Sequence, residues 1–227
     1  MANQENISLE LVYVGDPMCS WCWGFAPVVE KIDDSFTIPL RTIVGGLRPG
    51  DQAEPIDRMR PMLAHHWGQV AAASGQPFDL GGLDRTDWMY DTLVPDIAVV
   101  TMRSMAPVET LRFLATLQRA FYAERIDITD PDAHASLVSG FPVDPVAFVE
   151  AIRSPEMLAA TEKDFLEAQW LGVTGFPTLL MRDGATTVPL SLGYAPFERV
   201  AERITNLIEK NHPDAAAGLI CEIDGVC

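Results

Sequence analysis

The chain has 227 residues, of which 48% are hydrophobic and 21% are charged, as in an ordinary globular protein with enough residues for a substantial core. Its 16 Lys and Arg residues stand against 32 Asp and Glu residues, and the formal net charge of -16 repels nucleic-acid phosphates and anionic lipid surfaces. We therefore expect no nucleic-acid partner and no membrane partner. The first basic residue is Lys31, and no apolar run approaches the roughly 18 residues of a spanning helix, so we predict a cytoplasmic protein.

The first 50 residues predict a strand, a helix and a second strand. Residues 9–14 are rich in β-forming side chains and stop at the Gly-Asp-Pro of residues 15–17. Apolar residues at helical spacing then predict a helix whose first turn contains Cys22 and whose interior contains Pro27. A second strand is predicted over residues 37–44.

The middle of the chain, from about residue 55 to Gly172, predicts a block of helices. Asp130, Asp144 and Ser154 each precede a proline, which is the pattern of a capping residue followed by proline at the first helical position. Gly172 is expected to end the last helix of the block.

Strand character returns over residues 178–182 and 187–192, with Asp183-Gly184 as the expected hairpin turn. Pro196 then opens an amphipathic helix that should end near Asn211. The two ends of the chain can share one sheet while the helical block packs beside it. The pattern therefore predicts an α/β fold with a large all-helical insertion.

Cys19 and Cys22 lie at the predicted start of the first helix. Two cysteines one turn apart are close enough for their sulfurs to bond when oxidised. The first sulfur should face the free N–H groups and the positive end of the helix dipole, which lowers the pKa of Cys19 and makes it the nucleophile. Cys22, deeper in the turn, should attack the mixed disulfide and release the substrate.

Three neighbours of this pair have expected roles. Asp16 is the nearest candidate for accepting the proton of Cys22, and capping of the loop is its alternative role. Met18 and Trp21 are expected to offer apolar surface to an unfolded chain, whereas Trp23 is expected to pack in the core. A lone Cys-x-x-Cys can also be half of a zinc site or a pair of inert buried thiols. Its position between a strand and a helix favours redox chemistry.

Residues 15–24, GDPMCSWCWG, resemble the active-site segment of the DsbA family in the thioredoxin superfamily, its FrnE-like branch above all. Residues 173–178, VTGFPT, resemble the family loop whose cis proline faces the sulfurs. The resemblance implies a thioredoxin fold with a helical insertion and a disulfide oxidoreductase or isomerase that acts on protein thiols and disulfides. It also implies a cis bond between Phe176 and Pro177, and we expect these two residues and Trp21 to bind substrate.

We predict a thioredoxin-like domain from residues 1–50 and 173–211, a helical insertion over 51–172, and a tail over 212–227. No metal site and no bound cofactor are expected. Glutathione or a thioredoxin-type reductant is the candidate electron partner.

The tail carries a second pair, Cys221 and Cys227, in a segment where packing seldom demands cysteine. We expect this pair to exchange disulfides with the first pair, and the alternative is a small tail disulfide or two free thiols. Two other functions remain open. One is a glutathione-dependent transferase or isomerase of the kappa or hydroxychromene carboxylate isomerase type, which resembles the same fold. The other is a non-catalytic chaperone or zinc-binding module that uses the four cysteines together.

Overall fold

The structure, a computed structural model, describes residues 9–220. Its main sheet has the strand order β2-β1-β5-β6, with β1 parallel to β2, and β5 antiparallel to both β1 and β6. The strands are β1 (Leu9–Gly15), β2 (Leu40–Val44), β5 (Thr178–Asp183) and β6 (Thr186–Leu192), and a separate ladder joins β3 (Glu54–Pro55) and β4 (Met89–Tyr90). The helices are α1 (Ser20–Ser35), α2 (Ile56–Ser74), α3 (Leu93–Met105), α4 (Thr110–Ala123), α5 (His134–Leu137), α6 (Pro145–Ile152), α7 (Pro155–Trp170), α8 (Phe197–Asn211) and α9 (Ala216–Leu219).

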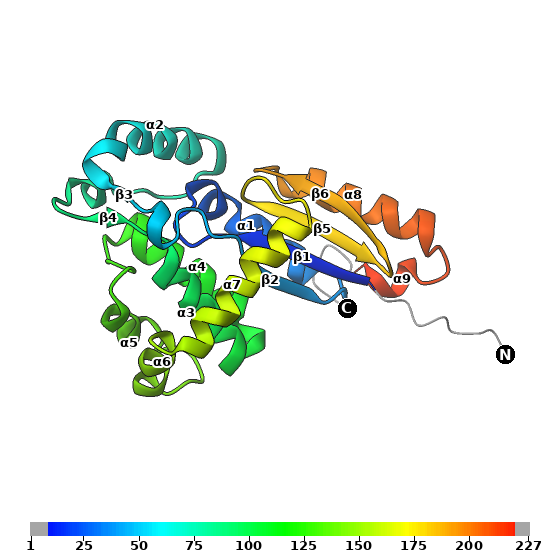
Figure 1. Cartoon of the computed structure of the whole chain (residues 1–227). Helices are drawn as coiled ribbons and strands as arrows, with labels where there is room; N and C mark the ends of the chain where they lie inside the picture. The colour runs from blue at the N-terminus through cyan, green and yellow to red at the C-terminus, as the bar shows by residue number, and fades with distance from the viewer. Residues whose placement is uncertain (1–8, 221–227) are drawn as a thin grey trace.

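Both faces of the main sheet are covered by helices, because its strands bury side chains on each side. In β1, Leu11 and Tyr13 belong to the larger core cluster, whereas Val12 and Val14 belong to a smaller one on the opposite face. Helices α1 and α8 contribute to the larger cluster, and α7 contributes to the smaller one. In Figure 1, α7 crosses in front of the strands and α8 lies behind them.

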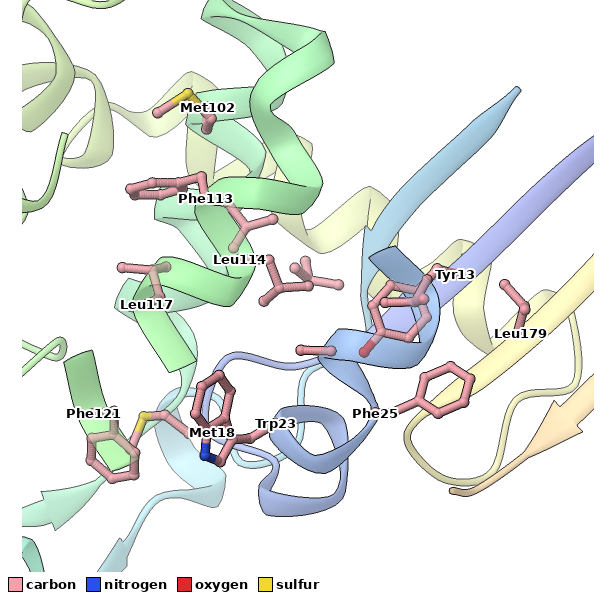
Figure 2. Packing of buried hydrophobic residues seen from close by; sticks show 14 of the residues in the cluster. Tyr13, Met18, Trp23, Phe25, Met102, Phe113, Leu114, Leu117, Phe121 and Leu179 are labelled. Atoms are coloured by element: carbon pink, nitrogen blue, oxygen red, sulfur yellow. The ribbon is translucent and has the colours of Figure 1, made fainter. Parts of the chain in front are cut away.

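The helical block between β2 and β5 shares the larger core with the sheet. Figure 2 shows this core running from Tyr13 of β1 through Trp23 of α1 to Phe113 and Phe121 of α4. The first helix of the chain is therefore packed between the sheet and the helical block. This arrangement, a mixed α/β fold with a helical insertion, is the one that the sequence predicts.

The three predicted caps are present in the helical block. The side chains of Asp130, Asp144 and Ser154 each accept a backbone N–H from the following turn. The Asp130 cap begins a short 3-10 turn, whereas the other two begin α6 and α7. Gly172 follows α7 with a φ of 74°, as a helix-ending glycine does. Within residues 9–220, no helix combines the length and the apolar character needed to cross a membrane.

Two strand boundaries differ from the prediction. The second strand begins at Leu40 and not at residue 37, because the backbone N–H of Thr37 donates instead to the carbonyl of Leu219 at 3.1 Å. The predicted hairpin turn is wrong by one residue. Asp183 still pairs with Thr186 in the ladder, so Gly184, with a φ of 58°, begins the turn. The ladder between β3 and β4 was not predicted, because two-residue strands leave no periodic pattern.

Candidate active site

Cys19 and Cys22 lie where the sequence places them, at the start of α1. Cys19 is the N-cap residue, with an extended backbone (φ −88°, ψ 113°), and its side chain makes no capping bond. Its sulfur therefore does not cap the helix and lies at the end where backbone N–H groups are unpaired. Cys19 is 6% exposed and Cys22 is 0% exposed, and no disulfide joins them in the structure. An approaching substrate can therefore contact Cys19 but not Cys22.

The loop before β5 faces Cys19 from the other side of the site. The peptide bond between Phe176 and Pro177 is cis, and the thiol of Cys19 donates to the carbonyl oxygen of Phe176 at 3.6 Å. Gly45, just after β2, makes room for this loop, since a Cβ there would lie 2.0 Å from the ring of Phe176. The structure thus brings together the two segments that the sequence singles out, although they lie more than 150 residues apart.

Asp16 is fully buried beneath the cysteines. Its Oδ1 accepts the backbone N–H of Met18 at 2.8 Å, and its Oδ2 accepts that of Leu47 at 2.7 Å. Burial raises the pKa of Asp16 from 3.8 to about 6, although the N–H groups of Leu47 and Met18 act in the opposite direction. Asp16 therefore holds the loop, as the alternative role required, and it also titrates close to neutral pH.

Cys22 is surrounded by groups that keep its thiol protonated. Burial raises the pKa of Cys22 well above its ordinary value, and the neighbouring sulfur of Cys19 raises it further. The negative charge of Asp16 acts in the same direction. The hydroxyl of Tyr13 also lies against Cys22, pointing from the sheet toward α1 as Figure 2 shows. Cys22 must therefore lose a proton before it can attack.

The three apolar neighbours of the cysteine pair differ in burial, and one of them is not exposed as predicted. Trp21 is half-buried, and its ring lies 5.9 Å from that of Tyr194. Trp23 is buried, and its Nε1 donates to the carbonyl of Pro77 at 3.0 Å, as expected for a core residue. Met18 is 0% exposed and is held by the hydroxyl of Tyr90, so the expectation that it offers surface to a substrate is wrong.

Sequence reasoning missed Tyr13, Tyr90 and Asp96 as neighbours of the site. Asp96, in the first turn of α3, is fully buried, and the charge of Asp16 acts on its pKa. Tyr90 and Asp96 come from segments about 70 and 80 residues away, and no local pattern marks them. Tyr13 had a signal, because it lies on the strand that leads directly into the active-site loop.

Within residues 9–220, no group of three or more His, Cys, Asp or Glu side chains is arranged to hold a metal ion. Cys221 and Cys227 lie outside the described residues. The segment just before them is held at the far end of α1, where Ile220 pairs with Phe36. Cys19 stands at the opposite end of this 16-residue helix, which is about 24 Å long.

Known proteins share this arrangement. Residues 10–205 match the family described as the DSBA-like thioredoxin domain. A putative protein disulfide isomerase from Nitrosomonas europaea is 28% identical, with a TM-score of 0.82 over 90% of this chain and 99% of that chain. The cytosolic disulfide reductase DsbM from Pseudomonas aeruginosa is 27% identical, with a TM-score of 0.75 over 87% of this chain and 98% of that chain. A further structure shows DsbM with GSH.

Among curated proteins, the ClpXP adapter protein SpxH from Halalkalibacterium halodurans is 24% identical over 180 residues, which are 76% of this chain. The match spans only 58% of the length of that relative. The family match, in contrast, includes both the active-site segment and the cis-proline loop. The chain belongs to the DSBA-like thioredoxin domain family.

Proposed function

We propose that the protein catalyses thiol-disulfide exchange on protein substrates, as a reductase or isomerase, through Cys19 and Cys22. The observation that carries the proposal is the contact between the Cys19 sulfur and the Phe176 carbonyl, 3.6 Å apart, at the start of α1. A substrate strand that pairs with the backbone of Phe176 is thereby aligned beside the nucleophilic sulfur. The half-buried side chains of Phe176 and Trp21 complete the docking surface, whereas Pro177 is buried next to it.

The reaction proceeds in two exchanges. The thiolate of Cys19 attacks one sulfur of a substrate disulfide, and the other sulfur leaves with the electron pair of the broken bond and takes a proton from water. Cys22 then gives its proton to Asp16 and attacks Cys19, which releases the second substrate sulfur as a thiolate that also takes up a proton. The substrate disulfide has gained two electrons, and Cys19 and Cys22 are left joined as a disulfide.

Asp16 suits the role of proton acceptor because of its charge and its pKa. With a pKa of about 6, it is mostly ionised at neutral pH and still binds a proton readily. When the proton moves from Cys22 to Asp16, the negative charge moves from the carboxylate to the sulfur. The buried site therefore never holds both charges at once, which the low dielectric of the interior would penalise.

The reductant in this scheme is glutathione or a thioredoxin-type protein, and the compartment is the cytosol. DsbM is named a cytosolic disulfide reductase and has been seen with GSH, which supports both assignments. In a reducing compartment, the pair is restored to the dithiol after each turnover.

Reduction of insulin disulfides by glutathione tests the proposal. We expect the wild-type protein to accelerate it and Cys19→Ser to abolish the acceleration. Cys22→Ser should lower it by on the order of a hundredfold, because the mixed disulfide is no longer resolved. Full activity in Cys22→Ser with bound glutathione would contradict the proposal and favour a single-nucleophile transferase. Urea unfolding of each variant controls for loss of fold.

We also propose that Cys221 and Cys227 exchange disulfides with the active-site pair. The anchor at Ile220 limits this exchange, because seven extended residues span at most about 25 Å, which is about the length of α1. Exchange by Cys221 therefore requires release of the anchor or a second molecule. In the double variant Cys221→Ser/Cys227→Ser, we expect slower reoxidation of the active-site pair. An unchanged rate of reoxidation would exclude this role for Cys221 and Cys227. An effect that grows with protein concentration would show that the exchange takes place between molecules.

A further inference from the structure

Asp96 is a second buried carboxyl group beside the active site, and the two exchanges described above make no use of it. It lies in the first turn of α3 and is 0% exposed. Its Oδ2 accepts the hydroxyl of Thr92 at 3.3 Å, but its Oδ1 is buried with no hydrogen-bond donor among residues 9–220. Leaving a buried carboxylate oxygen without a hydrogen-bond donor is strongly unfavourable. This oxygen therefore needs a proton of its own or a partner.

The neighbouring acid is Asp16. The hydroxyl of Thr92, which donates to Asp96, accepts the backbone N–H of Arg48 at 3.1 Å, and the preceding N–H, that of Leu47, donates to Asp16 at 2.7 Å. The two carboxyl groups are close enough for each to shift the pKa of the other. Two carboxyl groups can share a hydrogen bond only when one of them holds a proton. Both oxygens of Asp16 already accept backbone N–H groups, from Met18 and Leu47. Asp96 has the oxygen without a donor, so it is the group that carries the proton and donates it.

No cation neutralises the two carboxyl groups. Among the ion pairs of the described residues, none joins a Lys, Arg or His to Asp16 or Asp96. Arg48 is the nearby cation, but its guanidinium pairs with Glu54 at 2.5 Å. The other titratable groups that act on this site from the elements around it are Tyr13 of β1, Cys19 and Cys22 at the start of α1, Tyr90 of β4, Tyr122 of α4 and Asp164 of α7.

None of these groups supplies a positive charge, so two ionised carboxylates in contact would repel each other in a dry environment. A single proton between them removes one charge and gives the free oxygen of Asp96 its hydrogen bond.

We propose that Asp96 stays protonated at neutral pH and donates a hydrogen bond to Asp16, which makes Asp96 the positioning residue that keeps Asp16 ionised and ready to accept the proton of Cys22. Burial raises the pKa of Asp96 well above its ordinary value, and the charge of Asp16 raises it further, in agreement with the contacts. This inference rests on the proposed function, because it assigns the group that controls the proton acceptor of the second exchange.

The proton inventory of the second exchange is then complete. The S–H bond of Cys22 breaks, and its proton goes to Asp16. The sulfur of Cys22 bonds to that of Cys19, and the substrate sulfur leaves with the electron pair of the broken bond. Asp96 keeps its own proton throughout and acts only through Asp16.

Two variants separate this role from a structural one. Asp96→Leu removes the donor, so Asp16 is harder to ionise, whereas Asp96→Asn keeps an N–H donor for Asp16. The rate of substrate release from a mixed disulfide preformed on Cys19 is measured against pH. We expect the acid limb of the profile to move up by about one pH unit in Asp96→Leu, with about a tenfold lower rate on that limb. Asp96→Asn should remain near the wild-type midpoint.

Asp91→Asn is the matched control, because Asp91 lies in the same segment but accepts the backbone N–H groups of Gly50 and Leu93. We expect its profile to equal that of the wild type. If the midpoint of the pH profile does not move in Asp96→Leu, whatever the stability of that variant, the proposal is overturned.

A second measurement needs no activity. At about pH 8, ordinary carboxyl groups are ionised. The infrared spectrum of the wild-type dithiol protein should then still show the carbonyl stretch of a protonated carboxylic acid, and Asp96→Asn should lack it. Absence of the band from the wild type would overturn the shared proton. If the wild type showed the band but released no substrate at any pH, the proposed function would fail while the shared proton stood.

Discussion

Asp164 and the pair formed by Asp16 and Asp96 are both buried carboxyl sites next to the end of β2, yet they have opposite surroundings. The oxygens of Asp164 receive two guanidinium nitrogens of Arg103, each at 2.7 Å, and the backbone N–H of Val44 at 3.0 Å. The oxygens of Asp16 accept the backbone N–H groups of Met18 and Leu47, and their charged-group neighbour is another carboxyl, that of Asp96. One site has a cation and the other has none.

The difference in surroundings corresponds to a difference in role. A carboxylate held by a bidentate arginine keeps its charge, and that ion pair ties α3 and α7 to β2. A carboxylate without a cation gains and loses a proton close to neutral pH. The fold therefore places an aspartate in a structural ion pair at Val44 and another, for the proposed proton transfer, at Leu47, three residues further along the chain.

The largest expected effect on stability comes from breaking the ion pair between Arg103 and Asp164. Arg103→Met leaves the charge of Asp164 buried without a partner, and we expect it to lower the free energy of unfolding by about 3 kcal/mol or more. Urea unfolding at neutral pH measures this loss. Arg119→Met, which removes an exposed ion pair with Glu124, is the control and should cost less than about 1 kcal/mol. Equal losses in the two variants would show that the Asp164 pair contributes no more than a surface pair.

The proton-transfer site should respond to pH in the opposite sense from an ion pair. The pKa of Asp16 is raised from 3.8 in the unfolded chain to about 6 in the folded protein, so the folded state binds this proton more tightly. Its contribution to stability is complete below pH 3.8 and is lost as the pH rises through about 6. A shift of about two pKa units corresponds to at most about 3 kcal/mol.

Asp16→Asn should therefore show a smaller fall in stability than the wild type, because the part due to Asp16 is absent and only the part due to the raised pKa of Asp96 remains. Its rate of substrate release should be low at every pH. Urea unfolding at about pH 4 and about pH 7 compares the variant with the wild type. An equal fall in the free energy of unfolding of both proteins would show that groups other than Asp16 titrate over this pH range.

A smaller effect is expected at Gly45, which lies between the two carboxyl sites. Gly45→Ala places a methyl group against the ring of Phe176, and we expect a loss of about 1 to 3 kcal/mol from overpacking together with slower insulin reduction, because the cis-proline loop must shift. Gly68→Ala is the matched control, since a Cβ there meets nothing within 4 Å and the helix gains from alanine. Unchanged activity in Gly45→Ala would show that the loop does not need this contact.

The comparison also shows what the sequence could predict. The cysteine pair, its helix and the caps at Asp144 and Ser154 are local patterns of a few residues, and the structure has them in place. The contact of Asp96 with Asp16 depends on how α3 packs beside the active-site loop, which no local pattern encodes. The exposure of Met18 was mispredicted for the same reason, since the residues that cover it come from distant segments.

The central claim is that Cys19 attacks and Cys22 resolves. Trapping of the mixed disulfide tests it most directly. After mixing with a disulfide-bonded protein substrate, Cys22→Ser should accumulate a covalent adduct that mass spectrometry locates on Cys19, and Cys19→Ser should form none on Cys22. An adduct on Cys22, or no adduct in either variant while the wild type turns over, would contradict the account.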